Sequence, residues 1–140
     1  MIIVYTGGTF DLFHSGHVNF LRRCKEIAGE SGKVVVSLNT DDFVSRYKGL
    51  APIIDETERE QVLRACRYVD DVVMNVGDED SKIAILNVGA NYVAIGSDWA
   101  RKNYYAQMNF SQDWLDENNI GLVYIPYTRD ISTTEIKARL

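Results

Sequence analysis

The sequence has few cysteines, no long apolar run and no excess of positive charge. Its two cysteines, Cys24 and Cys66, lie among apolar residues at helical spacing. They predict buried free thiols in a reducing, cytoplasmic compartment and exclude a disulfide scaffold. No run of about 18 apolar residues occurs, and no basic segment precedes the apolar start, so neither a membrane span nor a signal peptide is expected.

Net charge and composition indicate which kinds of protein and partner can be excluded. Fifteen basic residues against twenty acidic ones give a net charge of −5, which disfavours nucleic acid or an anionic membrane as partner. The chain has 140 residues, of which 46% are hydrophobic and 25% charged. These values are typical of a globular protein, and we expect one domain over residues 1–140.

Short runs rich in Val and Ile alternate with helical patterns along the chain. Strands are expected near Ile2–Thr6, Lys33–Leu38, Asp71–Asn75, Tyr92–Ile95 and Leu122–Ile125. Helices are expected from about Gly16, at Asp41–Tyr47, after Asp55, at Asp80–Asn87, between Asn103 and Glu117, and after Ser132. This order predicts an α/β, Rossmann-like doubly wound domain, with a five-stranded parallel sheet and helices on both faces. Its ligand crevice is expected at the carboxyl ends of the strands.

A glycine-rich turn, GGTFDLFHSGH, joins the first strand to the first helix. Small residues let the backbone approach a ligand closely, and the free N–H groups at a helix start attract anions. His14 and His17 add side-chain donors at the same helix entrance, so the turn indicates a phosphate-binding site. The pattern is neither G-x-G-x-x-G nor a Walker loop, which disfavours a dinucleotide-binding oxidoreductase and a P-loop enzyme.

The two histidines also allow other interpretations, a metal site or purely structural roles. They are the only histidines in the chain, and Cys24 is expected in the core. Zinc requires more ligands than these, so no metal site held by protein side chains is predicted. Structural roles are disfavoured because core histidines do not usually lie in a glycine-flanked loop ahead of a helix.

Four separated segments resemble the nucleotidyltransferase superfamily, and its small glycerol-3-phosphate cytidylyltransferases above all. The segment GTFDLFHSGH is similar to the family's GTFD and H-x-G-H signature. The other three segments are Arg59 with Arg67-Tyr68-Val69-Asp70, Gly96-Ser97-Asp98-Trp99, and Ile131-Ser132-Thr133-Thr134. The resemblance implies transfer of CMP from CTP to a small phosphorylated alcohol, with pyrophosphate as leaving group, Mg²⁺ carried by the triphosphate, and a homodimer.

The resemblance also implies a role for each matching residue. Expected catalytic residues are His14, His17, Lys48 and Arg59, and expected acceptor-binding residues are Lys48, Arg59 and Trp99. Expected nucleotide-binding residues are Gly8, Thr9, Phe10, Asp11, Gly16, Arg67, Asp98, Thr128, Arg129, Ile131, Ser132 and Thr133. Asp11 is expected to orient a histidine or to bind a magnesium-bridged phosphate. Simpler interpretations are a solvated loop lysine for Lys48, surface helix arginines for Arg59 and Arg67, and helix capping for Ser132.

An acceptor phosphate with a second pKa of roughly 6 needs no general base, which agrees with the lack of paired carboxylates or a Ser–His–Asp pattern. The sequence departs from the family at Tyr127-Thr128-Arg129-Asp130, where R-T-x-G is expected. Lys48-Gly49 also resembles the adenylyltransferases that act on heptose phosphate. CTP with glycerol 3-phosphate is favoured, ATP with a sugar phosphate is the alternative, and a non-catalytic nucleotide-binding protein is a third.

Overall fold

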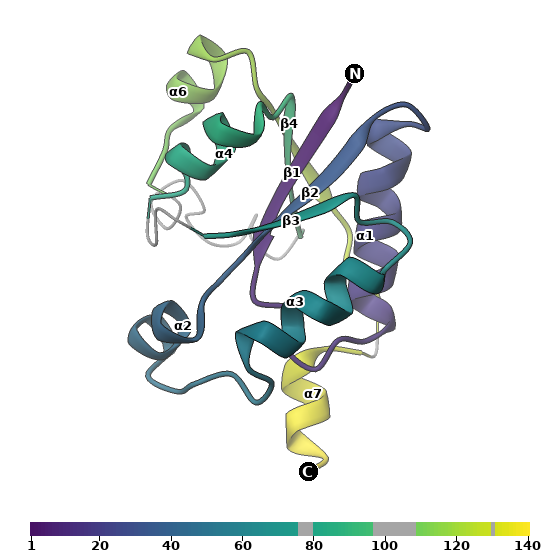
Figure 1. The fold of residues 1–140 in the computed structure, drawn as a ribbon, viewed down its shortest axis with the longest axis vertical. Helices are drawn as coiled ribbons and strands as arrows, with labels where there is room; N and C mark the ends of the chain where they lie inside the picture. The colour runs from purple at the N-terminus through teal and green to yellow at the C-terminus, as the bar shows by residue number, and fades with distance from the viewer. Residues whose placement is uncertain (76–79, 97–108, 130) are drawn as a thin grey trace.

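The computed structural model describes residues 1–75, 80–96, 109–129 and 131–140 and contains one parallel sheet (Figure 1). Its five strands are β1 (Ile3–Gly8), β2 (Lys33–Leu38), β3 (Asp71–Met74), β4 (Tyr92–Gly96) and β5 (Gly121–Ile125). They lie in the order β3-β2-β1-β4-β5, and every neighbouring pair is parallel. The predicted fold class and all five predicted strands are therefore confirmed.

The helices are α1 (Ser15–Ala28), α2 (Asp41–Lys48), α3 (Glu56–Ala65), α4 (Lys82–Val88), α6 (Gln112–Glu117) and α7 (Thr133–Ala138). Side chains at the first boundary satisfy backbone N–H groups: Thr40 caps α2, Asp55 caps α3, and Ser111 caps α6. The helix expected between Asn103 and Glu117 is described only from residue 109 onward. Within the described ranges, no helix is both long and apolar enough to cross a membrane.

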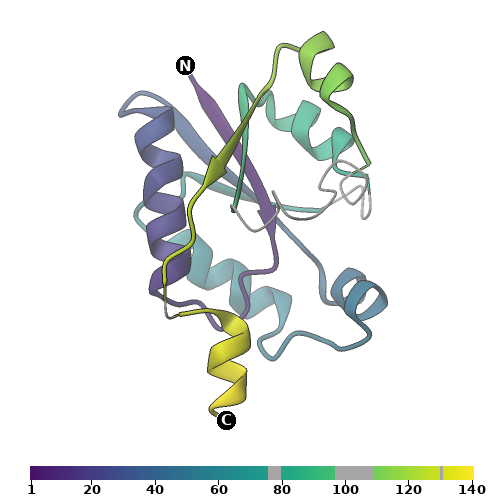
Figure 2. The same cartoon turned by 180° about the vertical axis from the view of Figure 1, so that it is seen from behind.

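Each face of the sheet packs against its own pair of helices (Figures 1 and 2). On one face, Leu21 and Cys24 of α1 and Leu63 of α3 are buried against strand residues such as Val36. On the other face, α4 and α6 pack against β1 and β4. The buried residues of this second cluster are Tyr5, Ala84, Ile85, Val93, Ile95, Phe110, Leu115 and Ile120. The alternation of strand side chains between two apolar layers explains why all five strands are Val- and Ile-rich.

The strand order reverses at β1, which fixes where a ligand can bind. From β1 the chain adds β2 and β3 on one side and β4 and β5 on the other. Crossover connections leave the carboxyl ends of β1 and β4 in different directions, and folds of this class bind their ligands at such a point. Figure 2 shows α7 beyond the carboxyl end of β1, so the last helix lies at the same edge.

A substitution at Gly32 tests how tightly the turn that joins α1 to β2 is packed. A methyl group on Gly32 would overlap the backbone carbonyl oxygens of Ala28 and Ile2, which cannot move without breaking the turn. We expect Gly32→Ala to lower the free energy of unfolding by about 3 kcal/mol, the upper range for overpacking. Chemical denaturation measures it, with the exposed neighbour Ser31→Ala as control. Equal stability of the two variants would contradict this account.

Candidate functional site

Two imidazole rings cap the first turn of α1. His14 occupies the N-cap in an extended conformation, and its Nδ1 accepts a hydrogen bond from the N–H of Gly16 at 3.0 Å. A second hydrogen bond runs in the opposite direction, because Nδ1 of His17 accepts from the N–H of His14 at 3.2 Å. This is a capping box built from two histidines. Because both Nδ1 atoms are acceptors, each neutral ring carries its proton on Nε2 and can donate it to a ligand.

The rings are held by stacking as well as by these hydrogen bonds. The centroids of His14 and His17 lie 3.9 Å apart, with 29° between the ring planes. His17 also stacks on Phe13 at 5.3 Å and contacts Phe10 at 5.2 Å. Phe10 and Leu12 adopt positive φ angles of 51° and 50° in the turn, a conformation that bulky residues rarely take. The turn therefore stores backbone strain where it places the aromatic contact with His17.

Burial keeps both rings neutral in the free protein. Burial lowers the pKa of His14 below its ordinary value. For His17, burial first and the neighbouring charge of His14 second lower the pKa to about 4, although the charge of Asp11 opposes the shift. Near neutral pH, the rings are therefore uncharged Nε2–H donors.

Glycine is required where the turn passes the rings. A Cβ atom on Gly16 would lie 2.7 Å from Cε1 and 2.9 Å from Nδ1 of His14. A Cβ atom on Gly8 would lie 2.8 Å from the ring of Phe10. Both distances are shorter than packed carbon atoms allow, so each glycine makes space for an aromatic ring of the site.

Asp11 anchors a loop and does not orient a histidine. The residue is 5% exposed, and its carboxylate accepts from the N–H groups of Leu12 at 3.1 Å, Ile53 at 2.8 Å and Ile54 at 2.9 Å. Burial alone would raise the pKa of this carboxyl. The Ile53 and Ile54 N–H groups, the charge of Lys137 and the Leu12 N–H together hold that pKa below its usual value. Among the described contacts, its carboxylate makes no hydrogen bond to either ring, which corrects the first role expected of it.

Arg59 lies under the site instead of on its surface. Its side chain is 1% exposed and donates four hydrogen bonds. The acceptors are the carbonyl oxygens of Ile54 at 2.8 Å, Thr9 at 2.8 Å and Asn39 at 2.9 Å, and the carboxylate of Asp41 at 2.7 Å. Four of its five N–H groups are therefore used within the protein. This geometry favours a positioning role over the direct phosphate contact that the sequence indicated.

The last helix brings Thr133 to the histidines. The hydroxyl of Thr133 donates to the carbonyl oxygen of Asp11 at 2.9 Å and lies 3.4 Å from Nε2 of His14. Ser132 caps α7 by accepting from the N–H of Glu135, and Ile131 lies beside Gly16. The structure thus brings together the two segments of the expected site that are farthest apart in the chain.

For the remaining expected residues within the described ranges, the structure gives no contact with either histidine ring. Thr9 accepts from the side chain of Asn39 at 3.1 Å, and Thr128 accepts from Asn19 at 3.0 Å. Arg129 is exposed. Lys48 is exposed at the end of α2, where Gly49 has a φ of 77°. Arg67 is exposed, with its guanidinium over the ring of Tyr68 at 5.8 Å. Asp98 and Trp99 lie outside the described residues.

Sequence reasoning missed Asn19, Asn39 and Lys137. Asn39 directly follows β2, so the rule that ligands bind at the carboxyl ends of parallel strands could have indicated it. Asn19 lies two residues beyond His17, but nothing local reveals its contact with Thr128. The ion pair of Lys137 with Asp11 at 3.7 Å joins the two ends of the chain, so no local pattern reveals it either.

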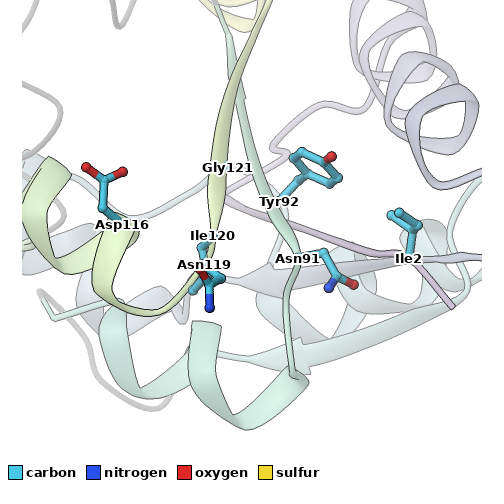
Figure 3. A pocket seen from close by; sticks show the side chains of 7 residues that line it. All are labelled: Ile2, Asn91, Tyr92, Asp116, Asn119, Ile120 and Gly121. Atoms are coloured by element: carbon cyan, nitrogen blue, oxygen red, sulfur yellow. The ribbon is translucent and has the colours of Figure 1, made fainter.

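One hollow of the described surface lies at the amino ends of the strands, opposite to the histidine turn (Figure 3). It has a volume of about 460 Å³ and is lined by Ile2, Asn91, Tyr92, Asp116, Asn119, Ile120 and Gly121. These residues surround the amino ends of β1, β4 and β5. Asn91 uses its Oδ1 atom to accept from the N–H of Ile3 at 2.8 Å, a structural contact. The histidine turn therefore remains the candidate site.

A family model with the description cytidylyltransferase-like matches residues 5–139. An FAD synthase of Korarchaeum cryptofilum is 32% identical over 98% of this chain and 90% of the relative. A glycerol-3-phosphate cytidylyltransferase of Bacillus subtilis is 33% identical over 98% of this chain and 95% of the relative. The crystal structure of a lipopolysaccharide core biosynthesis protein from Thermoplasma volcanium is 25% identical with a TM-score of 0.70, covering 91% of this chain and 97% of that one.

These matches agree with the fold and with the turn that carries the two histidines. The chain belongs to the cytidylyltransferase-like family of nucleotidyltransferases.

A substitution at Gly16 distinguishes an effect on the geometry of the site from an effect on the stability of the fold. We expect Gly16→Ala to displace the ring of His14 and to lower the rate of nucleotidyl transfer by about 10²-fold, the scale of a 1 Å misplacement. Stability is expected to change by less than about 1 kcal/mol, because the higher helix propensity of alanine offsets the weakened cap that the displaced ring leaves. Pyrophosphate release and thermal melting measure the two effects. The exposed neighbour Ser15→Ala serves as control, and an active Gly16→Ala protein would refute the steric argument.

The lowered pKa values of the histidines predict how stability depends on pH. In the unfolded chain both rings titrate near 6.5, whereas in the folded protein His17 titrates at about 4 and His14 below 6.5. The unfolded state therefore binds more protons in this interval, and the stability contributed by the neutral rings is complete above pH 6.5 and lost as the pH falls toward 4. We expect the melting temperature to fall over this window.

The variant His17→Gln, which keeps a neutral side chain, is expected to flatten that slope. Asp11, whose pKa is lowered from 3.8, contributes stability that is lost only below that value, so measurements above pH 4.5 separate the groups. An equally steep slope in His17→Gln would assign the effect to other residues.

Proposed function

We propose that this protein transfers CMP from CTP to sn-glycerol 3-phosphate, or a closely similar polyol phosphate, and releases pyrophosphate. The observation that supports this most is the pair of imidazoles whose Nδ1 atoms are occupied by backbone N–H groups. The pairing leaves two Nε2–H donors at the start of α1, at the sheet edge where this fold binds ligands. Such donors suit phosphate oxygens that gain negative charge during the reaction.

The chemistry needs positioning more than it needs a base. The phosphate of the acceptor attacks the α-phosphorus in line, the bond from the α-phosphorus to the bridging oxygen breaks, and pyrophosphate departs with that oxygen. Because the attacking phosphate is already ionised, no side chain has to remove a proton. In this proposal, His14 and His17 donate to oxygens of the α- and β-phosphates. Negative charge on the bound triphosphate favours protonation of the rings and opposes the effect of burial.

A magnesium ion suits this proposal only as part of the nucleotide. Within the described residues, no group of three or more histidine, cysteine, aspartate or glutamate side chains is arranged to hold a metal. Asp11 already accepts three backbone N–H groups. Mg²⁺ commonly stays on the phosphates with few protein ligands, where it neutralises their charge.

We extend the proposal to the location and assembly of the protein. We propose that it is cytoplasmic and forms a homodimer, as the family resemblance implies.

Glycerol 3-phosphate is preferred as acceptor because the Bacillus subtilis relative carries that name and aligns over 95% of its own length. Adenylyl transfer is the second candidate. The Korarchaeum cryptofilum relative is named FAD synthase at nearly the same identity, and FAD is FMN joined to an adenylyl group. The exchange of the family's arginine for Tyr127 lies beside Thr128, so it bears directly on the choice of nucleotide.

A product assay separates the candidates. The protein is incubated with CTP, ATP, UTP or GTP, each with glycerol 3-phosphate, heptose phosphates or FMN, and products are identified by mass. CDP-glycerol is the expected product, and FAD or an ADP-sugar would support the adenylyl alternative. Nucleotide binding without product under every combination would indicate a non-catalytic nucleotide-binding protein.

The role of His17 is tested by His17→Ala. Loss of one donor to a developing charge costs about 10²–10³-fold in kcat, and we expect a reduction of that size. Arg22→Gln on the exposed side of α1 is the matched control and is expected to keep full activity. A His17→Ala protein with unchanged kcat would argue against the proposed donor.

A further inference from the structure

Two buried hydroxyl groups lie toward the carboxyl ends of β1 and β2, on the face of the sheet opposite to α1. They belong to Tyr5 and Ser37, which are each 1% exposed. Ser37 pairs with Gly7 in the parallel register, and Tyr5 precedes Gly7 by two residues, so all three share one face. Tyr5 packs in the apolar cluster of α4 and α6, which identifies that face. The two hydroxyls therefore flank the backbone of Gly7 on the side away from α1.

The hydroxyl of Ser37 is buried without a hydrogen bond. Among the described residues, its Oγ atom has no donor or acceptor in hydrogen-bond geometry. Burial raises the pKa of Tyr5 and the side chain of Ser37 opposes that shift, so the two hydroxyl groups lie near each other. A buried polar group without a partner is destabilising, and native proteins keep few of them. A ligand that supplies the missing partner removes this cost.

The lack of a side chain at Gly7 lets a ligand group approach these hydroxyls. Gly7 is partly exposed, whereas Tyr5 and Thr6 before it are buried. Its φ angle lies outside the left-handed region, so the backbone conformation does not itself require glycine. A Cβ atom at this position would lie 3.2 Å from the hydroxyl of Tyr5 and 3.7 Å from the carbonyl oxygen of Ser37. Glycine therefore keeps free the position beside both residues.

The neighbouring side chains indicate the chemistry of the ligand. Asn39 follows Ser37 by two residues, and its Nδ2 donates to the hydroxyl of Thr9 at 3.1 Å. The side chain of Asn75 donates to Oδ1 of Asn39, also at 3.1 Å. None of these side chains carries a charge, and neither does Tyr5. Hydroxyls and amides pair with alcohol groups, whereas phosphates favour cations and helix starts, so the expected ligand group is an alcohol.

We propose that Tyr5 and Ser37 bind a hydroxyl group of the acceptor alcohol above the backbone of Gly7. This inference rests on the proposed function, since it takes the triphosphate to lie at the start of α1. In-line transfer keeps the attacking acceptor and the departing pyrophosphate on opposite sides of the α-phosphorus. Thr128, an expected nucleotide contact, follows β5, whereas Ser37 lies on β2, beyond β1. The β2 side of β1 is therefore the side for the acceptor.

Calorimetry with sn-glycerol 3-phosphate and with propyl phosphate, which lacks both hydroxyls, tests the contact. CMP is present in both titrations, so no transfer can occur. We expect Ser37→Ala to lower the affinity for glycerol 3-phosphate by about three- to tenfold, as for a hydrogen bond between uncharged groups. The affinity for propyl phosphate is expected to change by less than about twofold. Tyr5→Phe, which keeps the ring, and Gly7→Ala, which fills the position, are expected to act in the same direction.

The melting temperature without ligand separates this role from a structural one. Because Oγ of Ser37 makes no hydrogen bond among the described residues, Ser37→Ala is expected to melt at or above the temperature of the wild type. Thr6→Val is the matched control. Its hydroxyl is also buried on a strand, but it donates to the carbonyl oxygen of Ala94 at 2.9 Å. We expect Thr6→Val to melt earlier and to bind both ligands as the wild type does.

Several results overturn the proposal. One is equal affinity of the wild type for the two ligands, or no binding of glycerol 3-phosphate at all. Another is unchanged affinity for glycerol 3-phosphate in both Ser37→Ala and Tyr5→Phe. Equal losses for the two ligands in Ser37→Ala, or the same selective loss in Thr6→Val, also overturn it, because a general change of the sheet would then be the cause.

Failure of the proposed function is distinguishable from these results. It would show as selective binding of glycerol 3-phosphate by the wild type without formation of CDP-glycerol from CTP. The present inference is decided by the two binding constants alone.

Discussion

The site depends on the exchange of hydrogen bonds between two histidines and the first turn of α1. Free N–H groups at a helix start normally bind a serine, a threonine or an aspartate. Here the Nδ1 atoms of His14 and His17 take that place, so a single interaction caps the helix and selects the protonated atom of each ring. Local stability and the availability of Nε2–H donors therefore have the same cause.

Two buried, oppositely charged side chains keep that turn in place. Asp11 accepts from Ile53 and Ile54, and Arg59 donates to Ile54 and Thr9, so both fasten the segment before α3 to the histidine turn. Neither charge is unpaired, because each is surrounded by backbone groups of opposite polarity, the condition under which buried charges are tolerated. The strained φ angles of Phe10 and Leu12 persist because this framework constrains the backbone on both sides.

The fold and the centre of the site could be read from local patterns, but the roles of charged residues could not. Val- and Ile-rich runs placed all five strands, and only ends differed: β1 continues through Gly8, although glycine usually weakens a strand. The spacing of His14, Gly16 and His17 is local and was informative. The burial of Arg59 results from three loops that converge around it, and the contact of Lys137 joins the two ends of the chain. Neither leaves a periodic signal.

This division between local and distant contacts bears on how one family serves different substrates. The histidine turn is short and internally hydrogen-bonded, whereas the segment after β5 is fastened to α1 through a polar contact between Asn19 and Thr128. Identities of 32% and 33% to an FAD synthase and a glycerol-3-phosphate cytidylyltransferase therefore do not discriminate between nucleotides, because the shared turn contributes to both. Tyr127, which stands next to Thr128 where the family pattern has an arginine, is one position at which this chain departs from that pattern.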